Sequence, residues 1–288
     1  MATALVTVSS TGIGLATAMA LGRAGYQVYG TMRNPARAPE LASVAAKEKL
    51  PIKVLAMDVD NDASVRSTIA DVLAVSGRID VLVNNAGIAA FGSTEELPLA
   101  EFRRVMETNY FGALRCIQAV LPGMREQRSG HIISVSSLGG RTCLPAYAPY
   151  GASKFALECL SESLAAEVKA LGIRVSILEP GAVTTPIFDK LREVPAGTCY
   201  QHERRVYAMF DAKLKQASSP EVVADKVVEI VKSRDWKLRY PVGLDAEGLL
   251  QFRASKTDEQ WVDLVGIESN RDFADAVKRE IGMDIDLP

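Results

Sequence analysis

Tyr150 and Lys154 stand four positions apart in the middle of the chain and could together exchange a proton. They follow Pro149 in a segment whose residues have a helical pattern, and residues at i and i+4 share one face of a helix. A lysine ammonium beneath a phenol stabilises the phenolate, so a tyrosine that ordinarily titrates near ~10 would exchange its proton closer to neutral pH. The spacing predicts an acid–base pair, although a surface pair on an ordinary helix has the same spacing.

Two further polar residues are placed to assist such a pair. Ser137 ends the apolar run HIISVSS, thirteen residues before Tyr150, and open parallel sheets form their ligand crevice at the carboxyl ends of strands. A hydroxyl there can hold a carbonyl oxygen while Tyr150 supplies the proton. Asn109 lies inside a predicted helix, where its amide competes for backbone groups. We expect Asn109 on an exposed face or at a local kink that presents a carbonyl.

The elements that must position these residues alternate between strands and helices, which predicts an α/β fold with one doubly wound parallel sheet of about seven strands and helices on both faces. The predicted strands are 3–8, 27–32, 52–57, 79–83, 131–136, 174–178 and 238–242. The predicted helices are 15–25, 38–48, 62–75, 98–126, 150–171 and 220–233. We find no internal repeat and no linker, so the sequence predicts a single domain.

A Ser- and Gly-rich turn, Ser9–Gly14, joins the first strand to the first helix. Its glycines would let backbone N–H groups and a helix N-terminus approach a pyrophosphate, although a simple strand-to-helix turn also favours Ser and Gly. Arg33 follows the second strand, where an acidic residue would bind the ribose hydroxyl of NAD and an arginine suits a 2′-phosphate. A solvated loop charge is the alternative, but the position favours NADP(H) over NAD(H).

Composition excludes several other classes of function. The chain has 288 residues, of which 48% are apolar and 24% are charged, and its net charge is −2. Nothing in this balance calls for nucleic acid or an anionic membrane surface. We find no signal peptide and no apolar stretch that would span a membrane.

Cysteine and histidine usage indicates a reduced, cytoplasmic protein without a metal site. The four cysteines form no C-x-x-C pair and suggest no disulfide framework. The two histidines, His131 and His202, are isolated from each other. We expect both to be surface or loop residues rather than metal ligands.

A stretch after the sixth strand differs from the rest of the chain. Residues 182–217 contain Pro186, Pro195 and Gly197 and only weak helical patterns, which predicts a substrate lid at the rim of the crevice. The charged tail from about residue 255 is loosely amphipathic. We therefore divide the chain into a catalytic domain, 1–255, and a C-terminal extension, 256–288.

Taken together, these motifs resemble the short-chain dehydrogenase/reductase family over roughly residues 3–185. Thr7–Gly14 resembles its cofactor loop Thr-Gly-x-x-x-Gly-x-Gly, and Asn84–Gly87 its Asn-Asn-Ala-Gly motif. Asn109, Ser137, Tyr150 and Lys154 resemble its catalytic tetrad, and Pro180-Gly181 its Pro-Gly turn. The resemblance implies a Rossmann-type fold and an oxidoreductase.

The resemblance also implies a role for each matching residue. Tyr150 would be the general acid–base residue, Lys154 would lower its pKa and hold the nicotinamide ribose, and Ser137 would orient the substrate oxygen. Asn109 would expose a carbonyl that holds a water linked to Lys154. Arg33 with Ser10 would bind the 2′-phosphate, and Asp58 and Val59 would lie along the adenine. The implied cofactor contacts are Thr7, Ser9, Ser10, Thr11, Gly12, Ile13, Gly14, Arg33, Asp58, Val59, Asn85, Ala86, Gly87, Tyr150, Lys154, Pro180, Gly181 and Val183.

The segments VYGTMRNP, YGASKFALECLSESLAAEV and RYPVGLDA are similar to the subgroup of 17β-hydroxysteroid and retinol dehydrogenases. That similarity implies a bulky lipophilic alcohol or ketone of steroid, retinoid or polyketide type. The family also implies a homodimer or homotetramer that pairs through 98–126 and 150–171. A second hypothesis is a non-enzymatic NADP-binding regulator on the same fold.

Val8 is the one departure from the family pattern, because it stands where the cofactor loop has its first glycine. A branched Cβ disfavours the positive φ that a glycine adopts there. We expect weakened cofactor binding or a rearranged loop.

Overall fold

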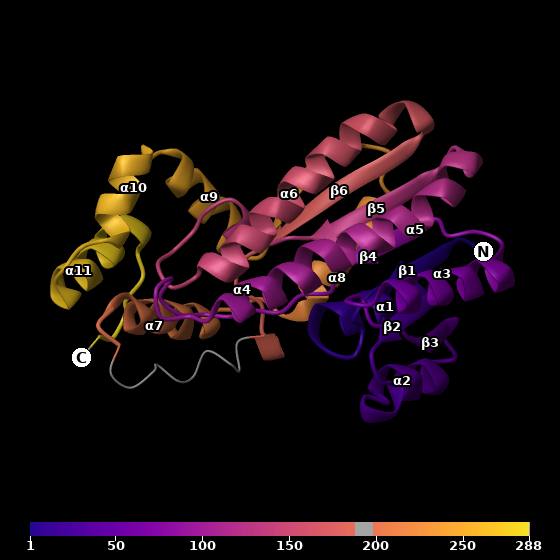
Figure 1. Ribbon diagram of the computed structural model, residues 1–288, viewed down its shortest axis with the longest axis horizontal. Coiled ribbons are helices and arrows are strands. Elements are labelled where there is room, and N and C mark those ends of the chain that lie inside the picture. Colours follow the sequence, from indigo (N-terminus) through magenta and orange to yellow (C-terminus); the bar gives the residue numbers. More distant parts are fainter. Residues whose placement is uncertain (188–197, 288) are drawn as a thin grey trace.

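A computed structural model describes residues 1–187 and 198–287. It contains a seven-stranded sheet, with every neighbouring pair of strands parallel, in the order β3-β2-β1-β4-β5-β6-β7. The strands are β1 Thr3–Val6, β2 Gln27–Met32, β3 Ile52–Ala56, β4 Val81–Asn84, β5 Gly130–Val135, β6 Ile173–Pro180 and β7 Arg239–Val242. This is the Rossmann-type doubly wound fold predicted from the sequence, in a single domain (Figure 1).

Helices cover both faces of the sheet because alternate strand residues point to opposite sides. Leu5 packs with the helices of one face, α3, α5 and α6, whereas Ala4 and Val6 pack with α1, α2 and α8 on the other. The helices of the two faces are α1 Gly12–Arg23, α2 Glu40–Glu48, α3 Asp62–Ser76, α5 Gly112–Gln127, α6 Ala148–Val168 and α8 Pro220–Lys232. The central strands β1 and β4 are therefore buried along their whole length, whereas the edge strands β3 and β7 are partly exposed.

The predicted helix over 98–126 is interrupted. It divides into α4 Leu99–Met106, a π-helical turn Glu107–Phe111 and α5. Asn109 lies within the turn, fully buried, so of the two expected surroundings the structure has the local distortion and not the exposed face. Inserted residues of this kind frequently mark functional sites.

Four helices were not predicted as separate elements. They are α7 His202–Leu214, α9 Ala246–Ala254, α10 Asp258–Val265 and α11 Asn270–Ile281. The last three gather at one end of the molecule, beside α7 (Figure 1). Met209 of α7 packs against Phe273 and Val277 of α11, so the C-terminal extension shares a small core with the segment predicted as a lid.

Arg205 fastens α7 to the C-terminal helices. The residue is 2% exposed, and its Nε donates to Asn270 Oδ1 at 2.8 Å. Its two terminal nitrogens donate to the backbone carbonyls of Ile267 and Glu268, between α10 and α11. Residues 188–197 of the predicted lid lie outside the described residues.

His131 is not a surface or loop residue, and that expectation was wrong. It lies on β5 with 3% of its surface exposed, and its Nε2 is 3.0 Å from Ser176 Oγ on β6. The central position of β5 in the sheet explains this burial, which lowers the pKa of the His131 imidazole to about 3. His202 begins α7 and is half-buried.

Within residues 1–187 and 198–287, no helix combines the length and the apolar character that a membrane span requires. In the same residues, no three His, Cys, Asp or Glu side chains come together as a metal site. All four cysteines are free thiols.

Candidate active site

Two adjoining cavities open at the carboxyl ends of the strands, beside the point where β1 lies between β2 and β4. Open α/β sheets bind their ligands at such a switch point. The cavities have volumes of about 380 and 650 Å³, and Val8, Arg33, Gly87 and Ile88 line both of them. They form one elongated crevice, whose ends we name the Tyr150 cavity and the Asp58 cavity.

The turn between β1 and α1 is fastened to the end of β4. Asn85 Nδ2 donates to the carbonyls of Thr7 and Val8, both at 3.0 Å. Thr7 Oγ1 accepts the backbone N–H groups of Asn85 and Ala86 at 2.9 and 3.0 Å. Val8 has a left-handed φ of 50°, which costs a residue with a Cβ roughly 1–2 kcal/mol. The loop therefore keeps a conformation suited to glycine, and Val8 strains it.

Close packing behind this loop requires a glycine at position 14. A Cβ on Gly14 would lie 2.2 Å from the Val8 carbonyl oxygen and 2.4 Å from Asn85 Nδ2. The close approach brings the N-terminus of α1 to the crevice, where Thr11, Gly12 and Ile13 line the Tyr150 cavity. A helix N-terminus with exposed N–H groups is a binding site for anions such as a pyrophosphate.

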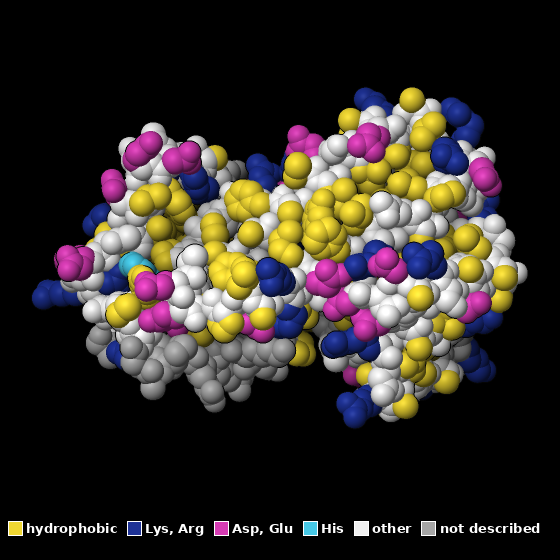
Figure 2. All heavy atoms as spheres, viewed as in Figure 1, with side chains coloured by type: hydrophobic (Ala, Val, Ile, Leu, Met, Phe, Trp, Pro, Cys, Tyr) yellow, Lys and Arg dark blue, Asp and Glu magenta, His cyan; other side chains and the backbone are white. Residues whose placement is uncertain are grey.

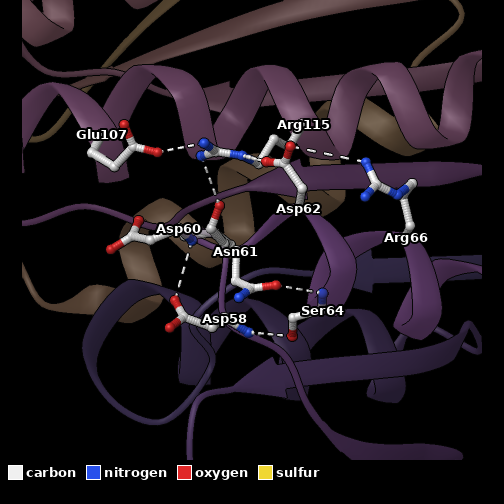
Figure 3. A network of polar contacts seen from close by, with 9 residues as sticks. Asp58, Asp60, Asn61, Asp62, Ser64, Arg66, Glu107 and Arg115 are labelled. Carbon is white, nitrogen blue, oxygen red and sulfur yellow. Dashed lines mark hydrogen bonds and ion pairs between the residues drawn. The ribbon is translucent and has the colours of Figure 1, made fainter.

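The Asp58 cavity is built on the loop between β3 and α3. Asp58 Oδ1 accepts the backbone N–H of Asp60 at 3.1 Å, and the Asp58 N–H donates to Ser64 Oγ at 3.0 Å (Figure 3). Arg115 of α5 holds the loop through Asp62, through the Val59 carbonyl at 3.2 Å and through Glu107. These contacts hold a polar loop at this end of the crevice.

Tyr150 and Lys154 share one face of α6 and both line the Tyr150 cavity. Lys154 Nζ lies 5.6 Å from the centre of the Tyr150 ring and donates to the Val135 carbonyl at 2.8 Å. Burial raises the pKa of Tyr150 to about 12, against a lowering effect of Ser137, and lowers the pKa of Lys154 to about 8. In the protein without a cofactor the pKa of Tyr150 is therefore raised, because burial is the largest effect on it and only Ser137 acts against it.

Ser137 faces two tyrosines. It follows the end of β5, and its Oγ accepts the backbone N–H of Gly139 at 3.1 Å, which starts a 3₁₀ turn at Leu138–Gly140. Burial raises the pKa of both Tyr147 and Tyr150, and the Ser137 hydroxyl opposes that rise in each. Ser137 therefore lies where a hydroxyl can share a substrate oxygen with a phenol.

Asn109 connects the π-helical turn to the loop after β4. Its Oδ1 accepts the Ile88 N–H at 2.8 Å, and its Nδ2 donates to the Ile88 carbonyl and to Ser153 Oγ, both at 2.9 Å. Ser153 Oγ in turn donates to the Tyr150 carbonyl at 2.7 Å. The side chain of Asn109 therefore ties α6 to the wall of the crevice, and the residue itself does not line it.

Most of the predicted site residues come together. Those lining the crevice are Ser10, Thr11, Gly12, Ile13, Arg33, Asp58, Val59, Asn85, Gly87, Ser137, Tyr150, Lys154, Pro180, Gly181 and Val183. Those lying behind it are Thr7, Ser9, Gly14, Ala86 and Asn109, of which Ser9 Oγ donates to the Thr31 carbonyl of β2 at 3.2 Å. The second group holds the loops that carry the first.

Sequence reasoning missed residues at both ends of the crevice. Arg37, Asp60, Arg104 and Thr108 line the Asp58 cavity, and Phe91 and Tyr147 line the Tyr150 cavity. Thr185, Pro186 and Ile187, which also line it, belong to the predicted lid. The second arginine of Arg33-x-x-x-Arg37 was a usable signal for the first set. The aromatic residues carried no local signal, because the fold brings them together from separate loops.

The crevice fits a dinucleotide. Its length spans two cavities, a helix N-terminus lies near its middle, and the exposed Arg33 borders both halves. Gly87 leaves room beside Lys154, since even a Cβ there would lie 3.5 Å from Nζ.

Comparison with known proteins places the chain among oxidoreductases. It is 34% identical to the uncharacterized oxidoreductase YusZ of Bacillus subtilis (strain 168), over 91% of this chain and 96% of that protein. It is 38% identical to human retinol dehydrogenase 8, over 82% of this chain and 80% of that protein. It is 34% identical to mouse 17-beta-hydroxysteroid dehydrogenase type 1, over 82% of this chain and 72% of that protein.

Solved structures share the fold. A short-chain dehydrogenase from Streptomyces avermitilis superposes with a TM-score of 0.77 at 34% identity, covering 88% of this chain and 92% of its own. An archaeal alcohol dehydrogenase from Thermococcus sibiricus, complexed with 5-hydroxy-NADP, gives 0.71 at 26% identity, covering 84% and 96%. An NAD⁺-bound xylitol dehydrogenase gives 0.75 at 26% identity, covering 84% and 97%.

The family model described as short chain dehydrogenase matches residues 2–196 of the sequence. That match covers the crevice from the loop after β1 to the residues that follow β6. The chain therefore belongs to the short-chain dehydrogenase/reductase family and is an oxidoreductase.

Proposed function

We propose that this oxidoreductase uses NADP(H) to interconvert a secondary alcohol and a ketone or aldehyde on a bulky lipophilic substrate. One observation carries the proposal. Ser137, Tyr150 and Lys154 line the same end of a crevice whose other end is polar and bordered by Arg33. Proton-transfer groups at one end and an anion-binding loop near the middle are the parts that nicotinamide-dependent reduction requires.

Tyr150 is the proposed proton donor, and NADP(H), when bound, supplies or takes the hydride. The buried phenol, whose pKa is raised to about 12, keeps its proton at neutral pH, which is the form that carbonyl reduction uses. Ser137 orients the substrate oxygen, and the buried ammonium of Lys154 stabilises the phenolate that remains after transfer. Positioned charge in a site without water is worth more than the same charge in solution.

A preference for NADP(H) is supported by the charge of the Asp58 cavity. Arg33 and Arg37 line that cavity, both exposed, together with Ser10. The strand β2 ends at Met32 without an acidic residue to hold the ribose hydroxyls of NAD(H). A guanidinium suits a phosphate monoester better than a neutral hydroxyl.

A lipophilic substrate is supported by the aromatic wall of the Tyr150 cavity. Tyr147 stacks on Phe91 with ring centroids 5.2 Å apart, and Phe210 of α7 meets the two rings at 5.6 and 5.8 Å. Such a wall would take a flat or extended apolar molecule. The relatives include a retinol dehydrogenase and a hydroxysteroid dehydrogenase, and the substrates in their names belong to that class.

The described part of 182–217 supports its role as a lid. Phe210 of α7 packs against the aromatic wall, and Glu203 accepts the backbone N–H and the hydroxyl of Ser93 at 2.6 and 2.8 Å. Both contacts join α7 to the loop after β4. We propose that α7 forms the outer wall of the substrate site, on the catalytic domain 1–255 and braced by the extension 256–288.

The proposal also covers the pairing of copies of this chain and its location in the cell. Phe111 and Phe155 are 42% and 46% exposed on the face made by α4, α5 and α6, and Figure 2 shows hydrophobic side chains gathered there. That face would pair two or four copies, as the predicted homodimer or homotetramer requires. The free thiols suit the cytoplasm.

The second candidate is a regulator that binds NADP without turnover, and the strained Val8 is the observation that favours it. An NADPH-oxidation assay with a panel of hydrophobic ketones, run beside calorimetric NADPH titration, separates the two. The enzyme hypothesis expects oxidation with at least one ketone. Tight NADPH binding with no oxidation across the panel would favour the regulator.

A further inference from the structure

A cluster of buried charges lies directly behind the active site. Glu158 of α6 and Glu179 of β6 are 4% and 1% exposed. Arg239 of β7 donates its Nε to Glu158 Oε2 at 2.9 Å and lies 3.6 Å from Glu179 Oε1. Arg141 Nη1 donates to the same oxygen of Glu179 at 2.9 Å. We name these four residues the buried ion cluster.

Each carboxylate of the cluster is close in the chain to a residue that lines the Tyr150 cavity. Glu179 immediately precedes Pro180 and Gly181, and Glu158 follows Lys154 by one helical turn. Figure 1 shows α6 running alongside β6, which carries Glu179. The cluster therefore joins α6 and β6, two elements that carry residues of the site, to β7.

Tight packing keeps Glu158 against the end of β5. A Cβ on Gly140 would lie 2.6 Å from Ser136 Oγ, 2.9 Å from Glu158 Cγ and 3.2 Å from the Lys154 carbonyl. Burial raises the pKa of the Glu158 carboxyl, and the Ser136 hydroxyl beside it opposes that rise. Lys154 Nζ reaches the neighbouring carbonyl of Val135. Lys154 therefore bonds to Val135 at the end of β5, and Glu158 lies beside Ser136, the next residue of the chain.

The ammonium of Lys154 needs a negative charge nearby, because burial disfavours the charged form of an amine. The carboxylates of the region are Glu158 and Glu162 on α6 and Glu179 on β6, and its cations are Arg239 on β7 and Arg141. Of these, Glu158 is the group that raises the pKa of Lys154. Glu179 is neutralised by two arginines, whereas Glu158 Oε1 is buried and has no hydrogen-bond partner among the described residues.

We propose that Glu158 is a positioning residue of the active site, whose buried carboxylate, held by Arg239, keeps the side chain of Lys154 charged beside Tyr150. Its role for turnover rests on the proposed function, since it acts only through Lys154 and Tyr150. Arg239 fixes Glu158 without neutralising it fully, because the same guanidinium also binds Glu162 at 2.5 Å. An uncompensated part of the Glu158 charge is left to act on Lys154.

Glu158→Gln and Glu162→Gln are a matched pair of variants that test the proposal. Both remove one carboxylate of α6 that binds Arg239, and the amide oxygen of glutamine can still accept from that guanidinium. Glu162 is 60% exposed and lies two turns from Lys154, so its loss changes the Arg239 contacts without uncovering the ammonium. Melting temperatures of both variants report any purely structural effect, and Glu158→Asp restores the charge.

The readout is the pH dependence of kcat/KM for ketone reduction. Glu158→Gln should move the alkaline limb to lower pH by roughly one unit or more, and Glu162→Gln should leave that limb in place. Glu158→Asp should return the limb toward the wild-type position. An unchanged alkaline limb in Glu158→Gln, or an equal shift in Glu162→Gln, would overturn the proposal.

A second readout does not depend on turnover. In protein labelled with ζ-¹⁵N lysine, the Lys154 resonance, assigned by its loss in Lys154→Arg, should titrate at lower pH in Glu158→Gln than in the wild type and Glu162→Gln. Equal titration in all three would reject the role of Glu158 even if ketone reduction is confirmed. A shifted titration in a protein that reduces no ketone would keep the electrostatic role and reject the proposed function.

Discussion

Tyr147 and Tyr150 present two buried phenols to one hydroxyl: their ring centroids are 5.0 Å apart, and Ser137 opposes the rise that burial causes in the pKa of both. Only Tyr150 stands one helical turn before Lys154, whose Nζ is 5.6 Å from the Tyr150 ring centre. Tyr147 instead stacks on Phe91 in the aromatic wall. The structure therefore provides a control residue of the same type beside the proposed proton donor.

Replacing Arg33 should change the choice of cofactor. Arg33→Asp should weaken NADPH binding and spare or favour NADH, because a charge-assisted contact to the 2′-phosphate contributes about 1.5–3 kcal/mol. The preference should move by at least about tenfold. Titration of each variant with both cofactors measures it. Arg125→Asp makes the same charge change on an exposed part of α5 and should have no effect. An unchanged ratio of NADPH to NADH affinity in Arg33→Asp would mean that Arg33 faces the solvent and does not contact the cofactor.

Replacing Val8 separates backbone strain from side-chain bulk. Val8→Gly removes the roughly 1–2 kcal/mol cost of a left-handed φ at a residue with a Cβ, whereas Val8→Ala keeps that cost and removes only the branched methyl groups. We expect Val8→Gly to tighten NADPH binding and to raise the melting temperature relative to Val8→Ala.

Calorimetry and thermal melts of the two Val8 variants decide between strain and packing. The Val8 side chain also packs against the core cluster that contains Leu5 and Leu82. If the burial of the Val8 side chain stabilises the protein by more than the backbone strain costs, both variants will melt at a lower temperature than the wild type and bind NADPH equally well. That result would contradict a role for strain in cofactor affinity.

Buried His131 should make folding sensitive to acid. Burial lowers its pKa from an ordinary 6.5 to about 3, so between these pH values the unfolded chain binds a proton that the folded chain does not. The stability linked to His131 is therefore fully present above pH ~6.5 and is lost as the pH falls toward 3. At pH ~5 the loss is about 2 kcal/mol.

Urea unfolding at several pH values tests this linkage. His131→Asn can keep a polar contact to Ser176 and should show a flatter dependence of unfolding free energy on pH below ~6.5. The comparison uses slopes, so a uniform loss of stability in the variant does not affect it. Parallel curves for the two proteins would show that His131 is protonated in the folded state.

The sequence predicted the parts of this fold that local patterns control. Central strands read as apolar runs because both faces of the sheet are covered. Tyr150 and Lys154 were noted for their helical spacing and assigned to the site through the other motifs of the chain. Asn109 was noted as a poor helix residue, and the π-helical turn Glu107–Phe111 is the physical counterpart of that signal.

Other features depended on contacts between distant segments and left no local pattern. His131 resembled a strand-end surface residue until its neighbours β4 and β6 were in place. The helix α7 owes its position to Arg205 and the carbonyls between α10 and α11, some sixty residues later in the chain. The raised pKa of Tyr150 reflects burial that spacing to Lys154 could not reveal.

The most direct test of the account is NADPH-dependent ketone reduction by Tyr150→Phe measured beside Tyr147→Phe. Tyr150→Phe removes the proposed proton and keeps the ring, so kcat should fall by ~10²–10⁴-fold while the calorimetric Kd for NADPH stays near the wild-type value. Tyr147→Phe removes the neighbouring phenol and should retain most of the turnover. Turnover that survives in Tyr150→Phe, or that is lost in Tyr147→Phe alone, would contradict the assignment of Tyr150 as the acid–base residue.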